Sequence, residues 1–152
     1  MDKRHSIKIH FHFVFQPFTL RNREGLKCFI EDIFNKEKKA IESVNFIFCN
    51  NMEIKKLNKE YLNHNYSTDI LTFDFSVKGK AILSDVFISQ EQVKLNAKEF
   101  DTSFTKEIHR VIFHGVLHLC GYNDKTSTDK ALMRDKEHYY LDKYFPDSRR
   151  ST

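Results

Sequence analysis

Two histidines, His114 and His118, lie four residues apart in a segment whose apolar residues follow helical spacing. On an α-helix both imidazoles project from the same face and can bind one cation. Gly121 is a natural left-handed residue to end such a helix, and the turn after it brings the carboxylate of Asp124 toward the same cation. We therefore predict a metal site with His114, His118 and Asp124 as ligands and a fourth position open to water.

Two neutral imidazoles and one carboxylate are a ligand set of catalytic zinc, which acidifies the water in the open position. Other interpretations of the same residues stay open. The two histidines could be core residues that bond to the backbone, with Asp124 capping the turn. Cys120 is a rival third ligand, although it lies near the opposite helix face from His118. His10 and His12 could also share a metal, but a solvated strand face explains their alternation.

Gly115 occupies the position at which metallopeptidases of the H-E-x-x-H kind carry their catalytic glutamate. The missing carboxylate argues against that mechanism. Glycine inside a helix costs about 1 kcal/mol relative to alanine, so it calls for a packing reason. We predict a close approach of this helix to its neighbour.

The elements that must position these residues follow from hydrophobic periodicity. Strands are expected over 7–15, 44–48, 71–75 and 82–88, the last two as a hairpin around Gly79. Helices are expected over 26–34, 54–61, 93–100 and 108–119, with a last one from about Thr128. Ser89 and Gln92 form a capping-box pattern before the third of these. The order predicts a layered α+β domain with a four-stranded mixed sheet and about five helices, the metal site lying on a helix and the loop after it.

The composition limits the class of protein. A chain of 152 residues with 40% hydrophobic residues fits a single globular domain over 1–152 and is too apolar for a disordered chain. No apolar run is long enough to span a membrane, and no secretory segment opens the chain, so we expect a cytoplasmic protein. Three distant cysteines predict buried, reduced thiols. A net charge of +4 is weak support for a nucleic-acid partner.

The segment from His114 to Asp124, HGVLHLCGYND, resembles the H-G-x-L-H-L-x-G-Y-D-H signature of the YbeY family of bacterial endoribonucleases that mature rRNA. Upstream, residues 57–61 (LNKEY) and 67–73 (STDILTF) resemble the family segments L-N-x-x-[FY] and P-T-D-V-L-S-F. Ser84-Asp85-Val86 resembles the family strand G-D-[IV]. The resemblance covers the chain from about Leu57 to the last helix.

The resemblance implies a single-domain, metal-dependent hydrolase that cleaves single-stranded RNA. It implies roles in 16S rRNA 3′-end maturation and ribosome quality control, with rRNA and the small ribosomal subunit as partners. No specificity for DNA and no membrane association are expected. A water activated by one divalent metal ion would attack the RNA phosphodiester.

Two positions depart from the family pattern. The third histidine of the family falls on Asp124, and a carboxylate there shifts the expected metal from Zn²⁺ toward harder cations such as Mn²⁺, with Ni²⁺ also possible. The arginine that follows the family's L-N-x-x-[FY] segment falls on Leu62. Arg110, on the same helix face as His114, could approach a phosphate instead, with Lys59 as a weaker candidate. Asp85 is the candidate general base from the adjoining strand.

Two alternative functions remain at this stage. The chain could be a non-catalytic ribosome-assembly factor whose metal is structural. Less favoured is a metallopeptidase, against which Gly115 argues.

Overall fold

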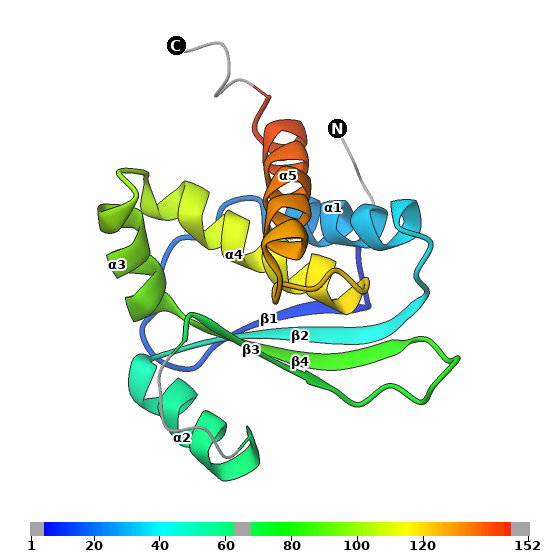
Figure 1. Ribbon diagram of the computed structural model, residues 1–152, viewed down its shortest axis with the longest axis horizontal. Helices are drawn as coiled ribbons and strands as arrows, with labels where there is room; N and C mark the ends of the chain where they lie inside the picture. Colours follow the sequence, from blue (N-terminus) through cyan, green and yellow to red (C-terminus); the bar gives the residue numbers. More distant parts are fainter. Residues whose placement is uncertain (1–4, 63–67, 147–152) are drawn as a thin grey trace.

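The computed structural model describes residues 5–62 and 68–146, which form one four-stranded sheet and five helices (Figure 1). The strand order is β1-β2-β4-β3; the pairs β1/β2 and β2/β4 are parallel, and β3 is antiparallel to β4. The predicted mixed sheet, the hairpin and the α+β class are thereby confirmed. The elements are β1 (Ile9–Phe13), α1 (Arg23–Lys36), β2 (Ile41–Cys49), α2 (Asn51–Leu62), β3 (Ile70–Asp74), β4 (Ile82–Ser89), α3 (Gln90–Glu99), α4 (Phe104–Leu119) and α5 (Ser127–Tyr144).

Helices cover both faces of the sheet. α1 and α4 pack on one face, α2 lies on the other, and α5 crosses the outer side of α4 (Figure 1). The larger core lies between the sheet and α1 and α4, and a smaller cluster of Cys49, Ile54 and Leu71 lies beneath α2. Among the described residues, no helix is long and apolar enough to cross a membrane.

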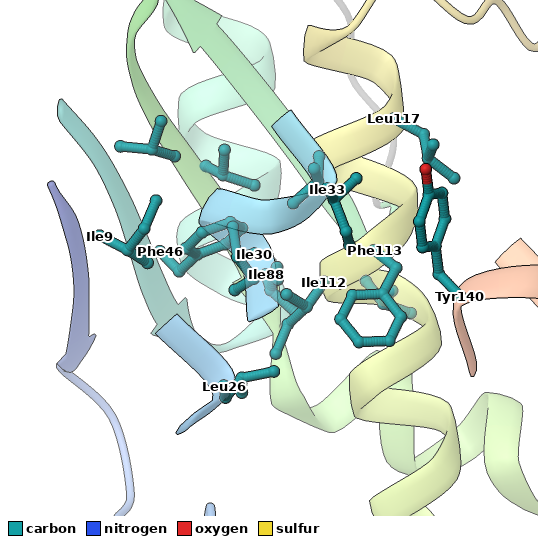
Figure 2. Packing of buried hydrophobic residues seen from close by; sticks show 14 of the residues in the cluster. Ile9, Leu26, Ile30, Ile33, Phe46, Ile88, Ile112, Phe113, Leu117 and Tyr140 are labelled. Carbon is teal, nitrogen blue, oxygen red and sulfur yellow. The ribbon is translucent and has the colours of Figure 1, made fainter. Parts of the chain in front are cut away.

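Strand alternation fills the larger core. Val44, Phe46 and Phe48 of β2 point into it because successive side chains on a strand face opposite sides. Each fully buried aliphatic or Phe side chain contributes roughly 1.5–3 kcal/mol relative to exposure. Figure 2 shows the sheet residues meeting two helices and α5, with Ile9, Phe46 and Ile88 facing Leu26, Ile30, Ile33, Ile112, Phe113, Leu117 and Tyr140.

The first strand is shorter than the sequence pattern predicts. Ile7 is 81% exposed, and Phe15 also lies outside the strand. β1 has a single neighbour, β2, and their register runs from Ile9 opposite Val44 to Phe13 opposite Phe48. The pairing ends there because β2 itself ends at Cys49. Alternation alone cannot show where a partner strand runs out.

Gly115 lies where α4 packs tightly against the sheet. A Cβ atom at this position would be 2.9 Å from Cδ1 of Ile70 and 3.2 Å from Cγ1 of Val86. Both distances are shorter than ordinary carbon contacts of about 3.5–4.0 Å. The structure therefore confirms the predicted close approach and shows that β3 and β4 are the elements approached.

All three cysteines, Cys28, Cys49 and Cys120, are buried, and no disulfide joins them in the described chain. Burial raises the pKa of the Cys49 and Cys120 thiols to about 12. Because the thiolate is the nucleophile and the metal ligand, these two groups are chemically inert at neutral pH. This weakens Cys120 as a rival to Asp124.

A carboxylate joins the end of α1 to α5. Glu37 accepts hydrogen bonds from the hydroxyls of Tyr122 at 2.7 Å and Tyr140 at 2.5 Å, and from Nζ of Lys136 at 3.3 Å. Burial disfavours the charged carboxylate, but these three donors outweigh it and lower the pKa of Glu37. The anionic form of Glu37 therefore stabilises the folded chain.

We expect Glu37→Gln to lower the free energy of unfolding at pH 7 by roughly 1.5–3 kcal/mol, the usual range for hydrogen bonds to charged groups. Because the pKa of Glu37 is lower in the folded chain than in the unfolded chain, its contribution to stability is complete above the unfolded-state pKa. That contribution is lost as the pH falls through the folded-state pKa. The difference between wild type and variant should therefore shrink as the pH is lowered below about 4.3. Denaturant unfolding at pH 7 and at acidic pH measures it; a difference that grows toward acid would contradict this assignment.

Candidate active site

The candidate ligands are presented by α4, whose ends are set by local signals. The side chain of Ser103 caps the first turn by accepting from the backbone N–H of Lys106 at 3.1 Å. Gly121 has φ of 106°, the left-handed conformation predicted to end the helix. Between these ends an apolar stripe faces the sheet, so Arg110, His114 and His118 form a line of side chains away from it.

His114 is oriented by a buried carboxylate that the sequence did not point to. Its Nδ1 lies 2.6 Å from Oε2 of Glu137, a residue of α5 that is 4% exposed. A carboxylate accepts only, so Nδ1 carries the proton and Nε2 is left as the atom available to a ligand. Histidines that bind metals usually donate their other ring N–H in this way.

Charge around His114 favours a cation. Burial alone would disfavour imidazolium, but the hydrogen bond and charge of Glu137, together with the charges of Asp69 and Asp124, raise the pKa of His114. Glu137 is affected in the opposite direction: burial opposes its charge, but His114 and Arg110 lower its pKa. The same carboxylates that attract a proton to the imidazole would attract a metal ion to its Nε2.

Arg110 is held by carboxylates on every nitrogen of its guanidinium. Nε and Nη2 donate to Glu107 at 2.9 and 2.7 Å, and Nη1 donates to Oε1 of Glu137 at 3.0 Å. Nη2 also lies 3.9 Å from Oδ2 of Asp69. The structure thus assigns Arg110 to holding Glu137. The prediction was a guanidinium that approaches a phosphate of the substrate, but its three nitrogens already donate to carboxylates.

Asp85 lies on the opposite face of the sheet from α4. Its neighbours in β4, Ser84 and Val86, are buried on the α4 side, so alternation turns Asp85 toward the other side. There its Oδ1 accepts from Nδ2 of Asn45 at 3.0 Å. This corrects the prediction of Asp85 as general base, because the sheet separates it from His114.

Asp124 shares a pocket with His114. The pocket has a volume of about 280 Å³ and is lined by both residues together with Arg110, Lys130, Met133, Arg134 and Glu137. His118 is exposed one helical turn beyond His114 and does not line this pocket. Within residues 5–62 and 68–146, no three His, Cys, Asp or Glu side chains are close enough to hold a metal ion. The structure therefore brings two of the three predicted ligands to one pocket and leaves His118 outside it.

Sequence reasoning missed Glu137, although a signal was present. Met133, Glu137 and Tyr140 are the buried residues of α5, and they follow helical spacing. A carboxylate inside such a stripe requires a buried partner, because an unpaired charge is costly in the core. Leu132, beside Met133 in the same helix, is 48% exposed although it is apolar. The missing information was which helix α5 packs against.

Asp69 is also brought to the site. It belongs to the segment at 67–73, and its Oδ2 accepts from Nδ2 of Asn96 at 3.2 Å. Together with the 3.9 Å approach to Arg110, this places a third carboxylate beside the His114 pocket. Lys59 and Leu62 lie on α2, on the other side of the sheet from α4 (Figure 1).

Comparison with known sequences decides the family. The family model described as Endoribonuclease YbeY matches residues 18–145. The chain belongs to the YbeY family. A YbeY endoribonuclease of Flavobacterium johnsoniae is 44% identical over 120 residues, covering 79% of this chain and 86% of the relative. One of Cytophaga hutchinsonii is 46% identical over 121 residues, covering 79% and 84%.

A solution structure of a protein from Thermotoga maritima has the same fold, with a TM-score of 0.63 and 29% sequence identity over 93% of each chain. The YbeY assignment confirms the family and the enzyme class predicted from the sequence, an endoribonuclease. The metal, the ligand set and the rRNA substrate stay predictions. The YbeY signature expects histidine where this chain has Asp124.

Proposed function

We propose that this chain is a single-domain, metal-dependent endoribonuclease that cleaves single-stranded RNA in the cytoplasm. Its substrate would be rRNA of the small ribosomal subunit, in 16S rRNA 3′-end maturation and ribosome quality control. Support for the substrate comes from membership of the YbeY family. The observation that supports the chemistry is the 2.6 Å contact between Nδ1 of His114 and Glu137.

The proposed cofactor is one divalent cation, Zn²⁺ first and Mn²⁺ or Ni²⁺ as alternatives. His114 offers Nε2, Asp124 lines the same pocket, and His118 is exposed on the next helical turn. The side chains of His118 and Asp124 are exposed, and the proposal requires both to turn toward Nε2 of His114 when the cation binds. When bound, the cation would acidify a water molecule and polarise a phosphoryl oxygen.

The other side chains of the pocket have separable tasks. Glu137 holds the Nδ1 proton of His114 and keeps the ring oriented, and Arg110 holds Glu137. Lys130 and Arg134 also line the pocket, and these two cations can hold the phosphate of the substrate. They offer the positive charge that the family places at the position of Leu62.

The test is cleavage of an end-labelled 3′ fragment of small-subunit rRNA by chelator-stripped protein, restored with zinc or manganese. We expect no cutting by stripped protein and site-specific cutting after restoration. Failure of every metal to restore cutting, with the fold intact by circular dichroism, would contradict the proposal and favour a non-catalytic assembly factor. Digestion of casein but not RNA would instead indicate a peptidase.

A further inference from the structure

A second, larger cavity continues from the His114 pocket. It has a volume of about 550 Å³ and shares Arg110, Arg134 and Glu137 with that pocket. Its lining residues come from the first half of α4, the second half of α5 and the connection between α3 and α4. We call it the α4/α5 groove; the further residues used below are Phe100, Lys106, His138 and Asp142.

The exposed charge in the α4/α5 groove is mainly positive. Two of its carboxylates, Glu107 and Glu137, are buried and both pair with Arg110, so the positive charge that faces solvent comes from Lys106 and Arg134. The ionisable side chains left facing solvent are those of Lys106, Arg134, His138 and Asp142. Lys106 and Arg134 therefore offer two cations to a polyanion, against one carboxylate.

An exposed aromatic ring stands at the far end of the groove. Phe100, which follows α3, is 62% exposed although it is a large apolar residue. Single-stranded nucleic acids are commonly bound by a positively charged groove that carries aromatic rings, on which unpaired bases stack. The combination of Phe100 with Lys106 and Arg134 has this composition.

The α4/α5 groove is long enough to hold a short stretch of single-stranded nucleic acid. Lys106, Arg110 and His114 follow one another at intervals of four residues, so they lie along one side of α4. At 1.5 Å per residue, the distance along the helix from Lys106 to His114 is about 12 Å. That is room for roughly three stacked nucleotides at 3.4 Å each.

We propose that the α4/α5 groove binds the single-stranded RNA that flanks the scissile phosphate, with a base stacked on Phe100 and phosphates held by Lys106 and Arg134. This inference rests on the proposed function, whose scissile phosphate lies in the His114 pocket. Stacking on Phe100 requires an unpaired base, so the groove gives the enzyme its preference for single strands.

Binding can be tested apart from cleavage. A fluorescein-labelled single-stranded RNA of about twelve nucleotides is titrated in chelator, and its anisotropy gives Kd at several salt concentrations. We expect Phe100→Ala to raise Kd roughly five- to a hundredfold, the range for loss of one base stack. Lys106→Gln with Arg134→Gln should reduce the slope of log Kd against log salt by about 1.4, or 0.7 for each phosphate contact.

Matched controls lie in the β3–β4 connection. Phe75 is 58% exposed and touches none of the pockets described above, so Phe75→Ala controls for loss of an exposed ring. Lys78→Gln with Lys80→Gln removes the same charge as the groove variant from an exposed turn. Both controls should leave Kd and the salt slope unchanged. Phe100→Leu, which keeps the apolar contacts of Phe100 but not the ring, should behave like Phe100→Ala.

Failure of this inference is distinguishable from failure of the proposed function. Wild-type protein that cleaves RNA after metal restoration, while the groove variants bind RNA as it does, would overturn the groove and keep the endoribonuclease. Control variants that weaken binding as much as the groove variants would also overturn it. Groove-dependent binding without cleavage by any metal would support the groove as an RNA site and contradict the catalytic proposal.

Discussion

Replacing His114 by alanine should reduce metal-restored RNA cleavage by roughly 10³-fold or more, because a catalytic cation supplies several kcal/mol and about 1.36 kcal/mol corresponds to a factor of ten. The variant removes the ring whose Nδ1 contacts Glu137 at 2.6 Å and whose Nε2 is free for a ligand. His118→Ala should have a comparable effect if its exposed ring completes the site. Cleavage rates and zinc binding by competition with a chromophoric chelator measure both variants.

His10→Ala provides the control for loss of a histidine, since His10 lies in β1 on the sheet face away from α4. It should cleave like wild type. Equal cutting by wild type and His118→Ala would indicate a contaminating nuclease or a site without His118. Asp124→Ala with full metal occupancy and full cleavage would exclude the carboxylate as third ligand.

Glu137→Ala is the substitution with the largest expected effect on stability. It leaves the ring of His114 without its buried partner and removes one of the two buried carboxylates that hold Arg110. Breaking a buried ion pair by removing one member typically costs about 3–5 kcal/mol. Denaturant unfolding at neutral pH measures the loss.

Glu137→Gln separates the positioning role from the structural one. Glutamine keeps the shape and one acceptor oxygen, but it lacks the charge that holds Arg110 and the Nδ1 proton of His114. We expect roughly 10- to 100-fold weaker metal binding, as for other partners of metal-bound histidines, with a smaller loss of stability. Asp135→Asn, an exposed position on the same helix, is the control. Wild-type metal affinity in Glu137→Gln would show that Glu137 serves the fold alone.

Local signals were sufficient to predict the element that carries the chemistry. The spacing of His114 and His118, the apolar stripe of α4 and Gly121 at its end all belong to one continuous segment. Helical geometry converts that spacing into a shared face without knowledge of the rest of the fold. Gly115 was predictable in the same way, because glycine inside a helix requires a close neighbour.

The roles of Arg110 and Asp85 depended on tertiary information. The alternation of side chains along β4 already placed Ser84 and Val86 on one face of the sheet and Asp85 on the other. Only the tertiary structure shows that α4 covers the face of Ser84 and Val86. Arg110 shares a face with His114 as expected, but besides Glu107 on its own helix its partners come from α5 and from Asp69, just before β3. Sequence patterns along one helix do not show which charges another helix brings to it.

The close seating of Gly115 against β3 and β4 also determines how motion is distributed around the site. The backbone that carries His114 is buried between the sheet and α5, so its amide protons should exchange with solvent only when the domain unfolds. Asp124 belongs to an exposed turn, where small openings suffice for exchange. Of the predicted ligands, His114 therefore lies on backbone with slow amide exchange and Asp124 on backbone with fast amide exchange. A cation bound by both would connect the buried helix α4 to its adjoining surface turn.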